Sequence, residues 1–218
     1  MIMLQLALDF IDLDEAMDVA KKAQNYVDLM EAGTPLIKSC GIRAVRALKD
    51  AFPNKKIVAD MKIMDTGALE ARLAANAGAD IVTVMAAADI NTVGEAINEC
   101  RRLGKLIYVD TLGVSTDKIK EIERLAPDYI CPHVGIDQQR KGIKLEDLIR
   151  QTNITIPMAV GGGINRLTAA RFVEAGAKII IVGNSITRAS DVQGEAKRIK
   201  EIINAAEKGL QDNPKPTP

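Results

Sequence analysis

The sequence predicts a single (β/α)8 barrel, the TIM-barrel fold of the α/β class, and three observations lead to it. Eight short apolar stretches alternate with eight stretches of helical periodicity along most of the 218-residue chain. The apolar stretches are almost continuously hydrophobic, as expected of parallel strands covered on both faces. The repeats are similar in length, which favours a closed barrel over the alternative, a doubly wound open sheet.

The elements follow one rule along the chain. Most apolar runs of strand length end in a polar residue or a glycine, and a helical stretch then begins at a capping residue or ends near a glycine. The expected strands are residues 3–8, 26–30, a central strand from 57, 80–84, 106–109, 129–131, 157–160 and 179–182. The expected helices are a stretch up to 23, 42–51, 67–76, 89–103, 115–125, 145–151, 165–175 and a long helix from 190. The expected N-caps are Asp12 or Asp14, Asp89, Ser115, Asn165 and Ser190.

Composition and charge exclude several classes of function. Lys and Arg together number 29, and so do Asp and Glu, so no basic field indicates a nucleic-acid or anionic-membrane partner. No apolar run approaches the roughly 20 residues that span a bilayer, and no secretory signal is visible. Hydrophobic residues make up 47% of the chain, which suits one domain over residues 1–208.

The cysteines and the last residues carry no site in this interpretation. Cys40, Cys100 and Cys131 are odd in number and widely spaced, which is typical of reduced thiols in a cytoplasmic protein. Residues 209–218 contain three prolines and no apolar pattern. They are expected to form a disordered end or a linker that once led to a second domain.

The central strand carries the candidate active site. Asp60 and Lys62 are expected on one face of this strand, with Met61 and Ile63 on the other, because successive side chains alternate. Asp65 follows in the turn before the next helix. A surface ion pair at a strand end is the alternative. Two carboxylates around one lysine at the end of an apolar strand favour a functional site instead.

Other strands also end in acidic residues. Asp9, Glu31, Asp60 and Asp110 follow four different strands, and the carboxyl ends of barrel strands form one active face. Four converging acids repel one another without a cation. Lys62 supplies one positive charge, and we expect a hard divalent ion with oxygen ligands, Mg²⁺, to supply the rest.

His133, the only histidine of the chain, ends the sixth strand. A lone histidine is commonly structural or simply exposed. Its position beside the acidic residues favours a role in acid–base catalysis, since imidazole titrates near neutral pH.

Glycines follow the last two strands and indicate a phosphate site. The run Gly161–Gly163 and the pair Gly183–Asn184 stand where barrels often bind phosphate, before helix N-termini. Tight turns alone also require glycine, but three in succession exceed that need. The run does not fit the dinucleotide fingerprint, so we expect a phosphorylated small molecule and no nicotinamide cofactor.

The motif Asp60-x-Lys62-x-x-Asp65 resembles that of the orotidine-5′-phosphate decarboxylase superfamily. Segments 31–38, 59–67 and 133–138 resemble its 3-hexulose-6-phosphate synthase branch, and the resemblance spans roughly residues 3 to 205. It implies a homodimeric barrel with shared active sites that joins formaldehyde to D-ribulose 5-phosphate with the help of Mg²⁺.

The resemblance also implies roles for individual residues. Glu31 and Asp60 hold Mg²⁺, Lys62 stabilises an enediolate, and His133 moves protons at the reacting carbons. Asp65 crosses the dimer interface into the neighbouring site. The residues implied in substrate binding are Asp9, Glu31, Asp110, Gly162, Gly163, Gly183 and Asn184. The sequence departs from the family pattern at Asn184, where relatives often carry glycine or arginine.

Two other functions remain open at this stage. The related 3-keto-L-gulonate-6-phosphate decarboxylases form the same kind of enediolate by losing CO₂, but they typically carry an arginine just after the strand-six histidine. The segment Val134–Ile136 stands there instead, which favours the synthase. A catalytically idle barrel that binds a sugar phosphate is the other possibility.

Overall fold

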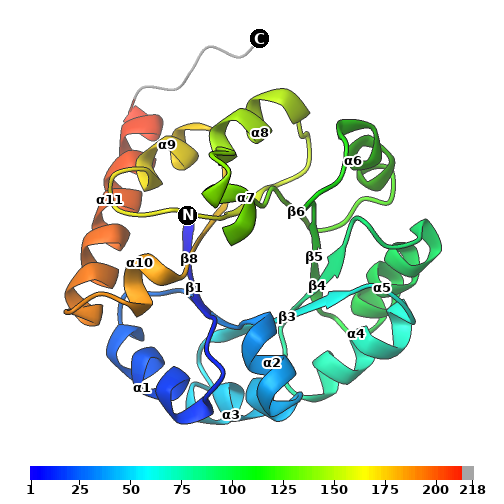
Figure 1. The fold of residues 1–218 in the computed structure, drawn as a ribbon, viewed down its shortest axis with the longest axis horizontal. Helices are drawn as coiled ribbons and strands as arrows, with labels where there is room; N and C mark the ends of the chain where they lie inside the picture. The colour runs from blue at the N-terminus through cyan, green and yellow to red at the C-terminus, as the bar shows by residue number, and fades with distance from the viewer. Residues whose placement is uncertain (213–218) are drawn as a thin grey trace.

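The computed structural model describes residues 1–212 and contains a closed ring of eight parallel strands surrounded by helices (Figure 1). The strands are β1 Met3–Leu8, β2 Leu29–Ala32, β3 Lys56–Ile63, β4 Ile81–Met85, β5 Leu106–Asp110, β6 Tyr129–Cys131, β7 Ala159–Gly161 and β8 Ile179–Val182. They pair in the order β6-β5-β4-β3-β2-β1-β8-β7. Single bridges from Ile130 to Met158 and from His133 to Gly161 join β6 to β7 and close the ring. The predicted (β/α)8 barrel is confirmed.

Most of the helices cover the outside of the ring, as the sequence predicts for a parallel barrel. They are α1 Leu13–Ala23, α2 Thr34–Cys40, α3 Arg43–Ala51, α4 Gly67–Asn76, α5 Ile90–Arg102, α6 Thr116–Glu123, α7 Ile136–Arg140, α8 Leu145–Thr152, α9 Ala169–Glu174, α10 Asn184–Thr187 and α11 Val192–Asp212. Asp12, Asp89 and Ser115 cap α1, α5 and α6 with their side chains, as expected. None of the helices in residues 1–212 is both long enough and apolar enough to span a bilayer.

The hydrophobic core has two parts. The larger part lies between strands and helices, and it includes Leu4, Leu6 and Leu8 of β1. The smaller part fills the inside of the ring, with one or two residues from each strand, such as Leu29, Val58 and Ile179. Alternate strand residues thus point into the ring or against the helices. The inward-pointing residues at the carboxyl ends of the strands therefore form the floor of any site at that end of the barrel.

Several sequence-based boundaries were wrong. β2 begins at Leu29 and includes Glu31, which the sequence placed after the strand. The short helices α2, α7 and α10 were not expected; α2 begins with Pro35 in its first turn, a residue common there but read as a turn signal. Asn165 does not begin α9: its side chain accepts from Leu167 N–H in a separate turn, and the helix starts at Ala169.

The end of the chain also differs from the prediction. A tail was expected from Gly209, whereas α11 continues without a break to Asp212. Its start lies at Val192, where Asp191 rather than Ser190 accepts from Gly194 N–H at 2.9 Å. The rest of the expected tail, residues 213–218, lies outside the described residues.

Candidate active site

A cavity of about 1210 Å³ opens at the carboxyl ends of the strands, and residues from all eight strands line it. Ten of the eleven sequence-predicted site residues take part in its wall. They are Asp9, Glu31, Asp60, Lys62, Asp110, His133, Gly162, Gly163, Gly183 and Asn184. The eleventh, Asp65, is exposed and does not line this cavity; its Oδ1 atom accepts a hydrogen bond from Thr66 N–H at 2.7 Å.

Strand β3 turns two charged side chains into the cavity. Asp60 and Lys62 line it, while Met61 and Ile63 pack into the core between strands and helices, as the alternation predicted. Lys62 has a φ angle of 47°, an unusual value for a residue with a side chain. The pairing of β3 with β4 shifts at this point, and the Lys62 N–H donates to Thr83 Oγ1 at 3.0 Å. This irregularity in the pairing of β3 with β4 thus helps to direct the Lys62 side chain into the cavity.

The Lys62 ammonium is held between two carboxylates. Its Nζ atom lies 3.1 Å from Oδ1 and 3.0 Å from Oδ2 of Asp60, and 2.9 Å from Oδ2 of Asp110. Burial alone would lower the pKa of Lys62, but Asp60 and Asp110 raise it above its ordinary value. Lys62 therefore stays protonated, so it acts as a fixed positive charge rather than as a nucleophilic amine.

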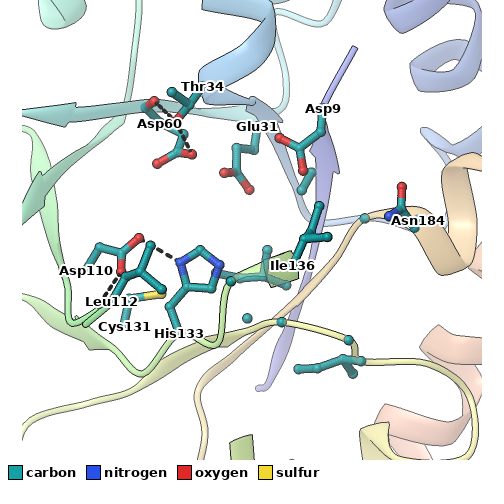
Figure 2. Close-up of a pocket in the computed structure, with 18 of the residues that line it drawn as sticks. Asp9, Glu31, Thr34, Asp60, Asp110, Leu112, Cys131, His133, Ile136 and Asn184 are labelled. Atoms are coloured by element: carbon teal, nitrogen blue, oxygen red, sulfur yellow. Dashed lines mark hydrogen bonds and ion pairs between the residues drawn. The ribbon is translucent and has the colours of Figure 1, made fainter. Parts of the chain in front are cut away.

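Two threonines hold Asp60 in place. Thr34 Oγ1 donates to Oδ2 of Asp60 at 2.6 Å, and Thr83 Oγ1 donates to Oδ1 at 2.9 Å. Figure 2 shows Thr34 beside Asp60 at one edge of the cavity. Sequence reasoning missed both threonines. Thr83 is the single polar residue of β4, and its isolation in an apolar strand is the signal that could have indicated it.

His133 and Asp110 form a hydrogen-bonded pair on the opposite side of the cavity (Figure 2). The distance from His133 Nδ1 to Asp110 Oδ2 is 2.9 Å. Burial raises the pKa of Asp110, but His133 and Lys62 outweigh it and lower this pKa from 3.8 to about 2. An ionised carboxylate can only accept, so Nδ1 carries the proton and Nε2 is the ring nitrogen free for acid–base chemistry.

Glu31 and Asp9 bring two further carboxyl groups to the cavity, and Lys62 forms its ion pairs with Asp60 and Asp110 instead. Burial, followed by the carboxylates of Asp60 and Asp9, raises the pKa of Glu31 well above its ordinary value. Burial and Asp60 also raise the pKa of Asp9. Figure 2 shows these three carboxylates pointing into one space. A divalent cation there would relieve their repulsion.

The donor set at this position suits Mg²⁺. Within residues 1–212, no three His, Cys, Asp or Glu side chains form a metal cluster by themselves. Mg²⁺, however, is commonly held by one or two carboxylates and completes its shell with waters and substrate oxygens. Glu31 and Asp60 provide such carboxylates, and burial followed by the charge of Asp60 raises the pKa of Glu31. The residues present therefore fit the ion that the sequence predicted.

The glycine turn after β7 is required by close packing. Gly162 has a φ angle of 118°, and a Cβ atom there would lie 2.4 Å from the carbonyl oxygen of Val134. Gly163 has a φ angle of 69°, and its Cβ would lie 2.9 Å from Gln139 Oε1. Any other residue at these positions would be strained. Both glycines also line the cavity.

Arg188 is a further cavity residue that sequence reasoning missed. It lies one helical turn after Asn184, since its N–H donates to the Asn184 carbonyl at 3.1 Å. The side chain is exposed, and no ion pair within residues 1–212 engages it. The sequence offered a signal in the spacing, because positions four apart on a helix share a face.

The fold and the site define the class of this protein. Residues 3–199 match the model of the orotidine 5′-phosphate decarboxylase / HUMPS family, and the chain belongs to that family. The chain is 40% identical to the 3-hexulose-6-phosphate synthase of Bacillus subtilis (strain 168), over 92% of this chain and 98% of the relative.

Solved structures give the same picture. The 3-hexulose-6-phosphate synthase from Salmonella typhimurium superposes with a TM-score of 0.90 at 37% identity, covering 94% of this chain and 100% of the other. A 3-keto-L-gulonate-6-phosphate decarboxylase from Vibrio cholerae superposes with a TM-score of 0.84 at 31% identity, covering 94% and 98%. The resemblance is greater to the synthases than to this decarboxylase.

Proposed function

We propose that this chain is an aldehyde-lyase that joins formaldehyde to D-ribulose 5-phosphate, reversibly, to give 3-hexulose 6-phosphate. One observation carries the proposal: Lys62 is fixed between Asp60 and Asp110, and Asp110 also binds His133. A permanent cation and an acid–base group thus meet in one cavity. The synthase names of the similar proteins support the choice of reaction.

His133 and Lys62 divide the chemistry between them. Nε2 of His133 takes a proton from C1 of the ketose, and the ammonium of Lys62 stabilises the negative charge of the resulting enediolate. C1 then forms a carbon–carbon bond to formaldehyde, whose carbonyl electrons become an alkoxide. The imidazolium of His133 returns the proton to this alkoxide, so the group is restored for the next turnover.

The proposal includes Mg²⁺ bound by Glu31 and Asp60. When bound, it supplies positive charge to the carbonyl and hydroxyl oxygens of the sugar. Asp9 binds a sugar hydroxyl from the neighbouring side of the cavity, and the hydrogen bonds from Thr34 and Thr83 keep Asp60 from turning away.

The phosphate belongs at the glycine-rich side of the cavity. Gly162, Gly163, Gly183 and Asn184 bind it through the backbone in this proposal. The three glycines have no Cβ, which permits close approach of an anion, and Asn184 stands at the start of α10. Arg188 adds a side-chain cation one turn beyond Asn184. In this proposal Arg188 strengthens the binding of phosphate at a place where relatives often carry glycine or arginine instead of Asn184.

A homodimer with shared active sites completes the proposal. Asp65 does not line the cavity of its own chain. The exposed apolar side chains of Met64, Leu69 and Leu73, which are 52%, 62% and 48% exposed, lie beside it in the sequence. A second copy of the chain that covers these residues would bring Asp65 to the neighbouring cavity.

The proposal also places the protein in the cytoplasm, which three free cysteines support.

One assay tests the reaction and separates it from its alternatives. Purified protein with Mg²⁺ is given formaldehyde and D-ribulose 5-phosphate, and consumption of both substrates is measured. Matched reactions contain 3-keto-L-gulonate 6-phosphate, with CO₂ release as the readout. We expect rapid formaldehyde-dependent turnover. Turnover of only the gulonate would establish the decarboxylase, and binding of ribulose 5-phosphate without turnover of either substrate would establish an idle barrel.

A further inference from the structure

A chain of buried hydrogen bonds runs along the floor of the cavity and ends on Glu31. Gln5 of β1 donates from Nε2 to Oε2 of Glu31 at 2.6 Å, and Tyr108 of β5 donates from its hydroxyl to Oε1 of Gln5 at 3.2 Å. Gln5 and Tyr108 are each 1% exposed, so both lie inside the ring. The two bonds define the Gln5 amide, whose nitrogen faces Glu31 and whose oxygen faces Tyr108.

This polar pair is not explained by packing. The neighbouring inward residues of the ring, including Leu29, Val58 and Ile81, are apolar, and an apolar residue of suitable size would fill the same space. Burying an amide and a hydroxyl costs free energy that their hydrogen bonds only offset. The one functional group at the end of the chain is the carboxylate of Glu31.

The geometry leaves the two oxygens of Glu31 in different situations. Oε2 is occupied by Gln5, whereas Oε1 accepts no hydrogen bond from residues 1–212, and Glu31 lines the cavity. The Tyr108 ring packs edge-to-face on Tyr129, with ring centroids 5.2 Å apart, and this contact holds the tyrosine in place. The Glu31 carboxylate is therefore restrained from turning.

We propose that Gln5 and Tyr108 are positioning residues, which hold Glu31 so that one carboxylate oxygen faces a divalent cation in the cavity. This inference rests on the Mg²⁺ site of the proposed function. Groups that orient a metal ligand in this way are typically worth 10- to 100-fold in metal affinity or activity. Both residues lie at the floor of the cavity and are almost fully buried, and Gln5 contacts the carboxylate of Glu31 directly. In this proposal their loss therefore acts on cation binding before it acts on chemistry.

The test measures cation binding without substrate. Mn²⁺ is titrated into the protein, free Mn²⁺ is followed by electron paramagnetic resonance, and Mg²⁺ is then added as a competitor. Gln5→Met keeps an unbranched side chain of similar length but removes the amide, and Tyr108→Phe keeps the ring contact but removes the hydroxyl. Tyr129→Phe, which alters the other ring of the same pair, is the matched control.

We expect Gln5→Met to weaken Mn²⁺ binding at least tenfold, Tyr108→Phe to weaken it by a few-fold, and Tyr129→Phe to leave it within twofold of the parent. At saturating Mg²⁺, Tyr108→Phe should recover most of the parent kcat, while the Mg²⁺ concentration for half-maximal rate rises.

If the folded variants Gln5→Met and Tyr108→Phe both bind Mn²⁺ with the parental affinity, the positioning role is overturned. The proposed Mg²⁺ site itself would still stand. If Gln5→Met does not fold, Tyr108→Phe decides by the same criterion. A parent that binds no Mn²⁺ and turns over fully after EDTA treatment would instead remove the Mg²⁺ site of the proposed function, and this inference with it.

Discussion

The carboxylate of Asp110 binds His133 and Lys62 through one oxygen, because Oδ2 lies 2.9 Å from both His133 Nδ1 and Lys62 Nζ. Its other oxygen accepts from Leu112 N–H at 2.9 Å, which restrains the carboxylate. The acid–base group and the permanent cation therefore keep a constant separation. Catalysis of this kind depends on such preorganisation, since groups already in place need no reorganisation during the reaction.

Replacing His133 should affect turnover more than substrate binding. We expect His133→Gln to lower kcat by about 10²–10⁴-fold, the range of general acid–base groups, because glutamine cannot exchange the proton that Nε2 carries. The KM for ribulose 5-phosphate should change only a few-fold, since the phosphate site lies elsewhere in the cavity. Steady-state kinetics measure both values. A variant with nearly parental kcat would show that His133 has a structural role.

Asp110 should make stability depend on pH. Its pKa in the folded protein is about 2, below the ordinary 3.8, so the stabilisation is present above pH 4 and is lost as pH falls toward 2. A shift of this size corresponds to about 2 kcal/mol. Urea unfolding from pH 7 to 3 should show Asp110→Asn less stable than the parent near neutrality, with a gap that narrows below pH 4. A difference in the free energy of unfolding that stays constant over this pH range would mean that the ion pairs of Asp110 do not contribute to stability.

Asp60→Asn should abolish turnover while the barrel stays folded. Asparagine has nearly the same shape, and the hydroxyls of Thr34 and Thr83 can rotate to donate or accept, so the surroundings remain satisfied. The substitution removes the charge of one of the two carboxylates that hold Lys62 and a proposed Mg²⁺ ligand. Exhaustive EDTA treatment of the parent should likewise stop the reaction, and added Mg²⁺ should restore it. Full activity after EDTA contradicts the metal site.

Arg188 should contribute to binding of the phosphate and little to the chemistry. A hydrogen bond to a charged group is worth about 1.5–3 kcal/mol, so Arg188→Ala should raise the KM for ribulose 5-phosphate roughly tenfold or more with kcat nearly unchanged. Inhibition by inorganic phosphate should weaken in parallel. Arg150→Ala, which removes an exposed arginine that does not line the cavity, is the matched control. Equal KM values for both variants would exclude Arg188 from the phosphate site.

A mixture of two inactive variants tests the shared active sites. An Asp65→Ala chain mixed with an Asp60→Ala chain should recover part of the activity, because one of the two sites in each heterodimer retains both residues. The homodimers of each variant provide the baseline. Activity that stays at this baseline, although subunits exchange by mass spectrometry, would mean that each barrel works alone.

The sequence by itself determined the fold and most of the site. Parallel strands buried on both faces require continuous apolar runs, and each run ends where the chain meets solvent. The polar residues at the ends of most of the eight runs could therefore be identified without coordinates. Asp60, Asp110 and His133 were found in this way, and all three line the cavity. The local D-x-K spacing further placed Lys62 beside Asp60, as confirmed by their contact.

Only the tertiary structure decided how these residues are held. Thr83, Gln5 and Tyr108 lie within strands, where polar residues carry no periodic signal, and their partners are 23, 26 and 103 positions away in the sequence. Arg188 became a cavity residue through a short helix that propensity did not predict. Long-range hydrogen bonds depend on strand order and register. Neither can be derived from local sequence, so these contacts became known only from the tertiary structure.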